Sequence, residues 1–321
     1  MKAVVLSRYG DATRLTRREV PRPAPGPTDV LVRVRATGVN DWDWNIIRGE
    51  FLTRLGEGLF RPRRSILGLD VAGEVIDVGS EVTRFSVGDR VFGDTSSAGF
   101  GGFAEFVATS ESALTPMPPS MSFTDAAALP HAGNLATQAL AAARLGPDDR
   151  LLINGAAGGV GTLAFQLASH LGVRDITGVD SEPKLDFMRQ LGFARTLDYR
   201  SVDFTSMGEQ FDVVIDARST RPPAHYVRAL AEGGRYVTVG GPMRRVLTIA
   251  ASRGRILKKA GKSIALLFLK ANLDNDQLVE LAAAGVMKPR IDTTWPLAET
   301  PAAMARFGRG EHLGKIVIVQ E

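Results

Sequence analysis

A glycine-rich turn between two apolar runs is the stretch of this sequence with the clearest chemical consequence. The run Leu151–Asn154 leads into Gly155-Ala-Ala-Gly-Gly-Val-Gly161, and a second run, Ile176–Asp180, follows. Glycines let the backbone approach a pyrophosphate, and the N-terminus of a following helix offers it free N–H groups and partial positive charge. The turn therefore predicts a dinucleotide site. Its predicted cofactor-binding residues are Ala156, Gly158, Gly159, Val160 and Gly161.

The turn departs at one position from the usual Gly-x-Gly-x-x-Gly pattern, because Ala156 stands where the first glycine belongs. The residues that follow support a helix, since apolar side chains recur at steps of three and four from Val160 to Leu171. Asp180 ends the second run, about 20–25 residues after the turn, where such sites read the ribose. The alternative is an ordinary strand–helix junction whose glycines serve packing.

Bulk composition narrows the function classes. The chain has 321 residues, which predicts two domains, and it contains no cysteine, which excludes disulfides, iron–sulfur clusters, cysteine-ligated zinc and a cysteine nucleophile. The net charge of +4 is mild, and no basic motif with interleaved aromatic residues indicates nucleic-acid binding. No apolar run is long enough to cross a bilayer, and no secretory signal opens the chain, so we expect no membrane partner and a cytoplasmic location.

Two patterns follow each other along the chain. Residues 1–124 carry short alternating runs, typical of a barrel-like β domain: Lys2–Leu6, Asp29–Arg35, Val71–Val78 and Asp89–Phe92. Beyond them, helical stretches near Thr124 and at Asn134–Leu145 alternate with apolar runs, which predicts a doubly wound parallel sheet. The later expected strands and helices are Leu151–Asn154, Ile176–Asp180, Phe211–Asp216, Arg235–Gly240, Ile264–Leu269, Asp276–Ala284, Glu299–Phe307 and Lys315–Val319. The predicted fold class is α/β.

The order of several short motifs resembles the medium-chain dehydrogenase/reductase family, on its zinc-free quinone oxidoreductase side. The motifs are Ala36–Asn40, Gly68–Val75, Val87–Phe92, Gly102–Phe106, Ala127–Pro130, Gly155–Gly161 and Gly314–Val317. The resemblance implies a GroES-like catalytic domain formed by residues 1–124 and completed by 272–321. It also implies a Rossmann domain at 125–271 and a homodimer that pairs through the strand Ile264–Leu269.

Zinc independence rests on residue chemistry as well as on the resemblance. Zinc-dependent relatives hold the metal through a cysteine and a histidine, and these positions carry Asn40 and Leu69 here. A leucine cannot coordinate a metal, and the four cysteines of a structural zinc lobe do not exist in this chain. We therefore predict no metal site. Without a Lewis acid, the easiest chemistry is hydride delivery to an already electrophilic carbon, as in quinones and α,β-unsaturated carbonyls.

Three residues are the predicted catalytic candidates. By resemblance Asn40 faces the nicotinamide, where its amide can donate to a substrate carbonyl, or it simply ends a strand. Asp41 can relay a proton or cap the next helix. His131 can donate a proton to the reduced product at neutral pH, or it is a packed or supporting residue. The family usually places a threonine against the nicotinamide, and here Leu135 occupies that position.

Cofactor choice depends on residues after the second Rossmann strand. Asp180 favours NAD, because its carboxylate accepts from the ribose 2′-OH and repels a 2′-phosphate. Ser181, Lys184 and Tyr199 instead match residues that surround the 2′-phosphate in quinone oxidoreductases, although Lys184 can equally pair with Asp180 at i,i+4. We predict NADPH, with NADH possible. Further predicted cofactor contacts are Arg218, for which a surface role is the alternative, and Gly240 and Gly241 at the end of the fourth Rossmann strand.

The resulting functional prediction is a zinc-independent reductase that passes a hydride from NADPH to a small hydrophobic quinone or α,β-unsaturated carbonyl. Segment 44–66 supports an apolar substrate if its side chains shape the mouth of a pocket, but they can equally form a packed helix. These side chains are Phe51, Leu52, Leu55, Leu59 and Phe60. The alternatives are an enoyl-thioester reductase and a protein that binds NADPH as a redox sensor without turnover.

Overall fold

Short strands with alternating apolar residues build the first of two compact units. The computed structural model describes residues 1–320 and, within 243–260, the side chains of 244–252 only. The first unit comprises Met1–Asn134, Lys270–Ala283 and the chain from Pro289 onward, and the second comprises Leu135–Leu269 and Ala284–Lys288. The first boundary therefore lies ten residues beyond the predicted one at 124/125, because helix α3 (Phe123–Ala128) packs on the strands of the first unit.

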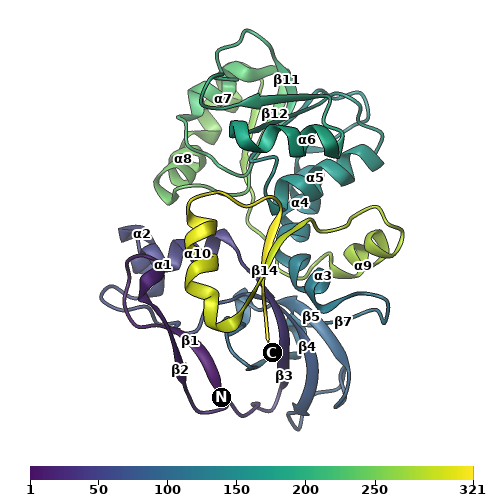
Figure 1. Cartoon of the computed structure of the whole chain (residues 1–321). Helices are drawn as coiled ribbons and strands as arrows, with labels where there is room; N and C mark the ends of the chain where they lie inside the picture. The colour runs from purple at the N-terminus through teal and green to yellow at the C-terminus, as the bar shows by residue number, and fades with distance from the viewer. Residues whose placement is uncertain (321) are drawn as a thin grey trace. The chain divides into compact units, whose positions relative to one another are not determined.

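The first unit contains a two-stranded ribbon and a larger sheet (Figure 1). The ribbon pairs β1 (Lys2–Leu6) with β2 (Leu15–Glu19). The larger sheet has the order β14-β15-β3-β4-β5-β7, with β6 also paired to β3. Its strands are β3 (Asp29–Gly38), β4 (Asp70–Val78), β5 (Arg90–Asp94), β6 (Phe106–Ser110), β7 (Thr115–Pro116), β14 (Ile291–Pro296) and β15 (Lys315–Val319).

The register of this sheet places the C-terminal strand β15 beside β3, which comes from the N-terminal part of the chain. The β15 strand runs antiparallel to β3, so that Val317 lies opposite Gly38 and Val319 opposite Ala36. On the other side of β3, Gly38 lies opposite Asp70 of β4, and Asp70 in turn lies opposite Asp94 of β5. Strand ends from distant parts of the sequence thus meet at one edge of the sheet, which is where polar side chains gather.

Five α-helices and a few short 3₁₀ turns complete the first unit in the described residues. Besides α3 they are α1 (Asp41–Arg48), α2 (Phe51–Glu57), α9 (Asn275–Ala283) and α10 (Thr300–Gly308), and α4 (Pro130–Ala143) begins here. Apolar side chains from β1, α1 and α10 form one core with Leu69 and Phe103, and a second core of valines lies between the larger sheet's strands. The second core is built largely from the alternating residues that predicted the strands.

The second unit is a six-stranded parallel sheet with the order β10-β9-β8-β11-β12-β13, which is the doubly wound arrangement. Its strands are β8 (Leu151–Asn154), β9 (Ile176–Asp180), β10 (Arg195–Asp198), β11 (Phe211–Asp216), β12 (Leu230–Thr238) and β13 (Ser263–Leu266). Apart from α4, its helices are α5 (Gly159–His170), α6 (Leu185–Leu191), α7 (Pro223–Ala229) and α8 (Met243–Ala260) (Figure 1). The predicted α/β fold class is confirmed.

Several boundaries in the second unit differ from the prediction. The strand predicted at Arg235–Gly240 starts earlier, at Leu230, and ends at Thr238, so Gly240 and Gly241 follow the strand rather than end it. The strand predicted at Ile264–Leu269 ends at Leu266, and Phe268 beyond it is 79% exposed. Homodimer formation through the β13 edge stays a prediction. No helix in the described residues is long and apolar enough to cross a membrane, and the cytoplasmic location also stays a prediction.

Candidate functional site

The glycine-rich turn connects β8 to α5 as predicted, and its geometry explains why Ala156 is tolerated. The left-handed conformation falls on Gly155, whose φ is +80°, and not on Ala156. The third glycine of the pattern is needed for close packing, since a Cβ on Gly161 would lie 2.4 Å from the Gly155 carbonyl oxygen and 2.6 Å from Ala156 backbone atoms. The departure at Ala156 thus leaves the shape of the turn intact.

The N-terminus of α5 offers an open anion site. Gly158 is the N-cap of this helix, and a Cβ built there would meet only the Gly155 carbonyl oxygen, at 3.4 Å. The N–H groups of Gly159 and Val160 lie in the first turn, where a helix provides no carbonyl partner for them. Gly158, Gly159 and Val160 are half-buried. These features fit a dinucleotide pyrophosphate, which these three residues and Gly161 would hold when a cofactor binds.

Asp180 lies at the carboxyl end of β9 and is tied to the turn. One carboxylate oxygen accepts from the Ala157 N–H at 3.2 Å, and the other accepts from the Ser181 N–H at 2.9 Å. The Lys184 ammonium lies 3.3 Å from the latter oxygen, and both side chains are about nine-tenths buried. The i,i+4 pairing that the sequence left open is therefore the arrangement in the structure. It offsets the negative charge that would repel a 2′-phosphate.

The ribose end of the predicted site also has an exposed cation that sequence reasoning missed. Tyr199 follows the end of β10, its N–H donates to the Asp180 carbonyl oxygen at 3.1 Å, and its side chain is 46% exposed. The Arg200 guanidinium lies 5.7 Å from the centre of the Tyr199 ring. A signal was present in the sequence, because Arg200 directly follows the predicted tyrosine.

The remaining predicted cofactor residues lie together in the second unit. Arg218 is exposed, and its side chain passes the turn so closely that a Cβ on Gly155 would meet Arg218 Cγ at 3.2 Å. Gly240 and Gly241 approach the segment that precedes and includes Ser219, whose N–H donates to the Gly240 carbonyl oxygen at 3.2 Å. The structure therefore brings these residues to the carboxyl edge of the parallel sheet, where ligands of such folds bind.

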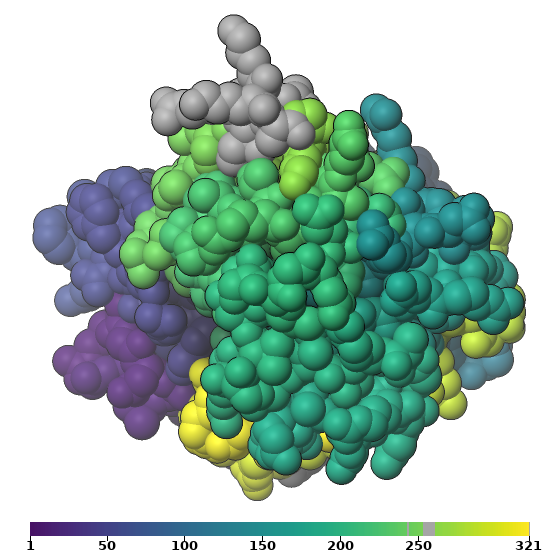
Figure 2. Space-filling view, turned by 90° about the horizontal axis from the view of Figure 1, so that it is seen from above, coloured from purple at the N-terminus to yellow at the C-terminus, as the bar shows by residue number. Residues whose placement is uncertain are grey.

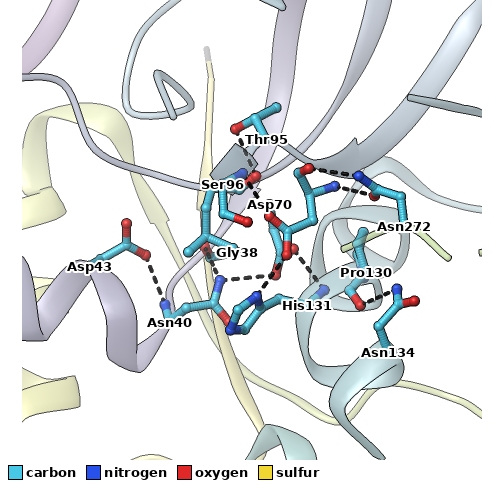
Figure 3. Close-up of polar contacts among 12 residues, drawn as sticks. Gly38, Asn40, Asp43, Asp70, Thr95, Ser96, Pro130, His131, Asn134 and Asn272 are labelled. Carbon is cyan, nitrogen blue, oxygen red and sulfur yellow. Dashed lines mark hydrogen bonds and ion pairs between the residues drawn. The ribbon is translucent and has the colours of Figure 1, made fainter. Parts of the chain in front are cut away.

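A buried polar cluster occupies the edge of the first unit's sheet where the strand ends meet (Figure 3). Asn40 follows β3 and is 5% exposed. Its amide nitrogen donates to the Asp70 carboxylate at 2.9 Å and to the Gly38 carbonyl oxygen at 3.2 Å, and its amide oxygen accepts from the Lys315 ammonium at 2.7 Å. Both amide hydrogens are thus engaged, which favours a role in holding the cluster together. Donation by Asn40 to a substrate carbonyl stays a prediction.

Asp70 and Lys315 form the buried ion pair of this cluster. The Lys315 ammonium lies 3.1 Å from an Asp70 oxygen. The Lys315 side chain is 5% exposed, and the Asp70 side chain is fully buried. The second Asp70 oxygen accepts from the His131 backbone N–H at 2.9 Å and so caps the N-terminus of α4. Burial raises the pKa of Asp70 above its ordinary value, although the Lys315 charge opposes that rise.

His131 is in the first turn of α4 and contacts a second buried carboxylate. Its Nδ1 lies 2.7 Å from Asp94 Oδ2, with the Asp94 side chain fully buried and the imidazole 11% exposed. The Trp42 ring lies 6.5 Å from the imidazole, measured between ring centres. The predicted catalytic residues Asn40 and His131 are therefore neighbours of one cluster, which also contains Asp70, Asp94 and Lys315.

The two aspartates after Asn40 have structural roles in α1. Asn40 is the N-cap and Asp41 is the first helical residue, so the prediction that Asp41 caps this helix is wrong by one position. Asp41 instead accepts from the Asn45 amide at 2.9 Å. The Asp43 carboxylate accepts from the backbone N–H groups of Asn40 and Gly68, and burial raises its pKa to about 7. Proton relay by Asp41 stays a prediction.

The donor set at the zinc positions of the family does not fit the metal. Leu69 is fully buried in the apolar core of the first unit, and the Asn40 oxygen accepts from the Lys315 ammonium. A cation cannot share that oxygen with an ammonium at hydrogen-bond distance without strong repulsion. In residues 1–320, as far as side chains are described, no three histidine, aspartate or glutamate residues are grouped to hold a metal ion.

A pocket of about 310 Å³ opens at the opposite edge of the parallel sheet, lined by Arg150, Thr177, Arg195 and Phe211. These residues belong to the amino ends of the strands or precede them. Because ligands of doubly wound sheets bind at the carboxyl ends, this pocket is not part of the candidate site.

Sequence reasoning missed Asp70, Asp94 and Lys315. A signal for Lys315 was the presence of a cation at the start of an otherwise apolar strand, Lys315–Val319. Asp70 and Asp94 showed no such signal, since an acidic residue beside a strand end usually faces solvent. Only the register of β3, β4 and β5 places them inside.

The two units together define a class of proteins, the nicotinamide-dependent oxidoreductases with a GroES-like and a Rossmann domain. The family description "alcohol dehydrogenase GroES-like domain" matches residues 26–119, and "zinc-binding dehydrogenase" matches residues 191–318. The chain is 32% identical to a chloroplastic quinone oxidoreductase of Triphysaria versicolor, over 99% of this chain and 98% of that protein. It is 30% identical to an NADPH-dependent alkenal/one oxidoreductase of Arabidopsis thaliana, over 99% of this chain and 79% of that protein.

A solved structure agrees with these sequence matches. The quinone oxidoreductase of Coxiella burnetii superposes with a TM-score of 0.87 at 29% identity, and the match covers 99% of each chain. The chain belongs to the medium-chain dehydrogenase/reductase family, among its quinone oxidoreductase-like members. It is an oxidoreductase of a family that binds a nicotinamide cofactor.

Proposed function

We propose that this protein is a zinc-independent reductase that uses NADPH to reduce quinones or α,β-unsaturated carbonyl compounds. When bound, the reduced nicotinamide supplies a hydride to an electrophilic carbon of the substrate. The chain's own residues hold the cofactor at the turn and the N-terminus of α5. The names of the relatives support the substrate class, since they describe quinone and alkenal/one oxidoreductases.

The observation that carries the proposal is the chemistry of the side chains at the two positions that bind zinc in zinc-dependent relatives. Leu69 has no donor atom, and the Asn40 amide is bonded on both sides, to Asp70 and to Lys315. Alcohol oxidation requires a group that stabilises an alkoxide, which zinc provides in the zinc-dependent relatives. Substrates whose carbon is already electrophilic do not have this requirement.

The experiment that tests the proposal is stopped-flow oxidation of NADPH and, separately, of NADH, with three acceptors: a 1,4-quinone, a simple enone and a crotonyl thioester. We expect NADPH oxidation with the quinone or the enone. Preference for the thioester would favour an enoyl-thioester reductase. Tight NADPH binding without oxidation by any acceptor would contradict the reductase and favour the redox sensor.

Cofactor preference gives a prediction at the ribose end. We expect Arg200→Ala to raise the KM for NADPH about tenfold and to leave the KM for NADH unchanged, because a charged hydrogen bond to a phosphate contributes roughly 1.5–3 kcal/mol. Lys184→Met is the matched variant. Since it removes the counter-ion of nearly buried Asp180 and leaves that charge to repel a 2′-phosphate, it should weaken NADPH binding more than NADH binding. Steady-state kinetics with each cofactor would measure both effects. An unchanged KM for NADPH in Arg200→Ala would contradict phosphate binding by Arg200.

The segment 51–60 gives a prediction about the substrate. Four of its five large apolar side chains are exposed: Phe51 by 70%, Leu55 by 57%, Leu59 by 50% and Phe60 by 89%. The segment from α1 through α2, purple-blue in Figure 2, accordingly lies at the molecular surface. Its apolar side chains therefore do not form a packed helix, and we propose that they contact the apolar part of the substrate.

We expect Phe51→Ser combined with Phe60→Ser to raise the KM for a quinone with an isoprenoid tail by about tenfold, because burying a phenylalanine contributes roughly 1.5–3 kcal/mol. The KM for a quinone without a tail should stay the same. Phe268→Ser, at an equally exposed phenylalanine of the second unit, is the control and should change neither value. Equal KM values for the tailed quinone in the double variant and the unaltered protein would rule out this contact.

A further inference from the structure

Asp94 is held as a fixed partner for the His131 imidazole. Its Oδ2 lies 2.7 Å from His131 Nδ1, and its Oδ1 accepts from the Ser96 N–H at 2.8 Å. The Asn272 side chain bonds the Asp94 backbone twice, accepting from its N–H at 2.7 Å and donating to its carbonyl oxygen at 2.8 Å. The carboxylate therefore has one orientation, and it faces the imidazole.

This arrangement leaves the second ring nitrogen available. A carboxylate at hydrogen-bond distance keeps a proton on Nδ1, so the chemistry of the ring depends on Nε2. Among the described residues no group hydrogen-bonds to Nε2, and the imidazole keeps 11% of its surface exposed. Figure 3 shows the ring between Asn40 and the start of α4. An imidazole fixed through Nδ1 and accessible at Nε2 has the form of a general acid.

The charges that surround His131 come from four elements. Asp94 on β5, Asp70 on β4 and Asp43 on α1 are negative when ionised, and Lys315 on β15 is positive. The N-terminus of α4 adds a partial positive charge. Burial and Lys315 disfavour the imidazolium, but the Asp94 charge and hydrogen bond outweigh them, so the pKa of His131 lies above its ordinary value. The same interaction keeps the pKa of Asp94 below its ordinary value, although burial opposes this.

We propose that His131, oriented by Asp94, delivers the proton that completes reduction of an enone, and that Asp94 is a positioning residue for it. The inference rests on the proposed function. Addition of a hydride to the β-carbon moves an electron pair onto the α-carbon and the carbonyl oxygen. The Nε2–H bond then breaks as the α-carbon forms its new C–H bond, and water returns a proton to the imidazole afterwards. Mass and charge balance with one hydride and one proton for each substrate.

Protonation of a carbon atom requires a positioned acid, and protonation of an oxygen atom does not. Protonation of a carbon is slow without a positioned acid, whereas the oxygens of a reduced quinone exchange protons rapidly with water. A proton donor at His131 therefore predicts a dependence on the acceptor. It also predicts that the proton reaches one face of the α-carbon only, which an α-substituted enone makes visible as a single stereoisomer.

The test compares His131→Gln and Asp94→Asn with the control Asp292→Asn, which removes an ion pair to Arg306 in the same unit. With an α-substituted enone, His131→Gln should lower kcat about 100-fold and yield both α-stereoisomers, since general acids contribute 10²–10⁴-fold. Quinone reduction should change far less. Asp292→Asn should keep the stereochemistry and both rates.

Asp94→Asn is tested through pH and spectroscopy. His131 donates only when protonated, so enone turnover falls as pH rises through its pKa. Removing the Asp94 charge lowers that pKa, so the fall should come at lower pH than in the unaltered protein. NMR titration of His131 in the ligand-free protein should show the same displacement, and the chain has only four histidines to assign.

The inference would be overturned, while the reductase stands, by equal losses with enone and quinone in His131→Gln or by a His131 titration that Asp94→Asn does not move. Reduction of quinones but not enones by the unaltered protein would also overturn it. If the unaltered protein reduced none of the acceptors, that result would instead contradict the proposed function, and the inference with it.

Discussion

Gly158→Ala is expected to weaken dinucleotide binding at least about tenfold while the second unit stays folded. The protein itself has room for the methyl group, because a Cβ at this position meets only the Gly155 carbonyl oxygen at 3.4 Å. The backbone at Gly158 has φ −83°, which alanine adopts readily. The free energy of unfolding should fall by no more than about 1 kcal/mol, the usual difference between glycine and alanine at an N-cap. The methyl group would, however, occupy the space through which the backbone approaches the pyrophosphate.

Gly161→Ala is the matched variant, and its effect should have a different origin. Its Cβ would lie 2.4–2.6 Å from backbone atoms of Gly155 and Ala156, which no flexible side chain can relieve. We expect a loss of about 3 kcal/mol in unfolding free energy, at the upper end of overpacking effects, and no detectable cofactor binding. Fluorescence titration with NADPH and urea unfolding separate the two cases. Unchanged NADPH affinity in Gly158→Ala would contradict the assignment of the pyrophosphate to this turn.

Lys315→Met is expected to cost about 3–5 kcal/mol of unfolding free energy at pH 8, because it leaves the Asp70 carboxylate buried without its cation. Asp70 is fully buried, and only the Asn40 amide and the His131 N–H would remain to stabilise its charge. Urea unfolding at several pH values would measure this loss. The double variant Asp70→Asn with Lys315→Met should recover most of the stability, since no charge is then stranded.

The direction of the pH dependence follows from the pKa of Asp70. Its pKa is already above the unfolded value, so the folded state holds the proton more tightly, and stability falls as pH rises between the two values. Lys315→Met removes the charge that opposes this rise and thus enlarges the deficit at high pH. As pH falls the loss should shrink, because Asp70 becomes protonated in the folded state and, below the unfolded value of about 4, in both states. A variant as stable as the unaltered protein at pH 8 would contradict the buried pair.

Local sequence patterns predicted several strands that are mostly apolar. The bounds of β8, β9, β11 and β15 coincide with the predicted runs, because a buried strand bounded by turn residues leaves a sharp signal. Helix α8 was not predicted. Its many basic residues obscure the apolar period, and of its described side chains only Ile249 is fully buried.

The two halves of the candidate site differ in how far sequence could predict them. The cofactor turn is local, so Gly158, Gly161 and Asp180 could be placed from spacing alone. The polar cluster is not local: Asn40 and Lys315 are separated by 275 positions, and they meet only because β15 pairs with β3. Whether Lys184 would bind a phosphate or Asp180 likewise depended on side-chain geometry that spacing leaves open.

Hydride transfer from the nicotinamide to carbon without zinc is tested most directly by isotope tracing. Protein dialysed against a chelator would be incubated with an enone and NADPH that carries deuterium at C4 of the nicotinamide. We expect turnover at the rate of the untreated protein, with one deuterium at the β-carbon of the product. Loss of turnover on chelation that zinc restores, or a β-carbon hydrogen that originates from solvent, would contradict the account.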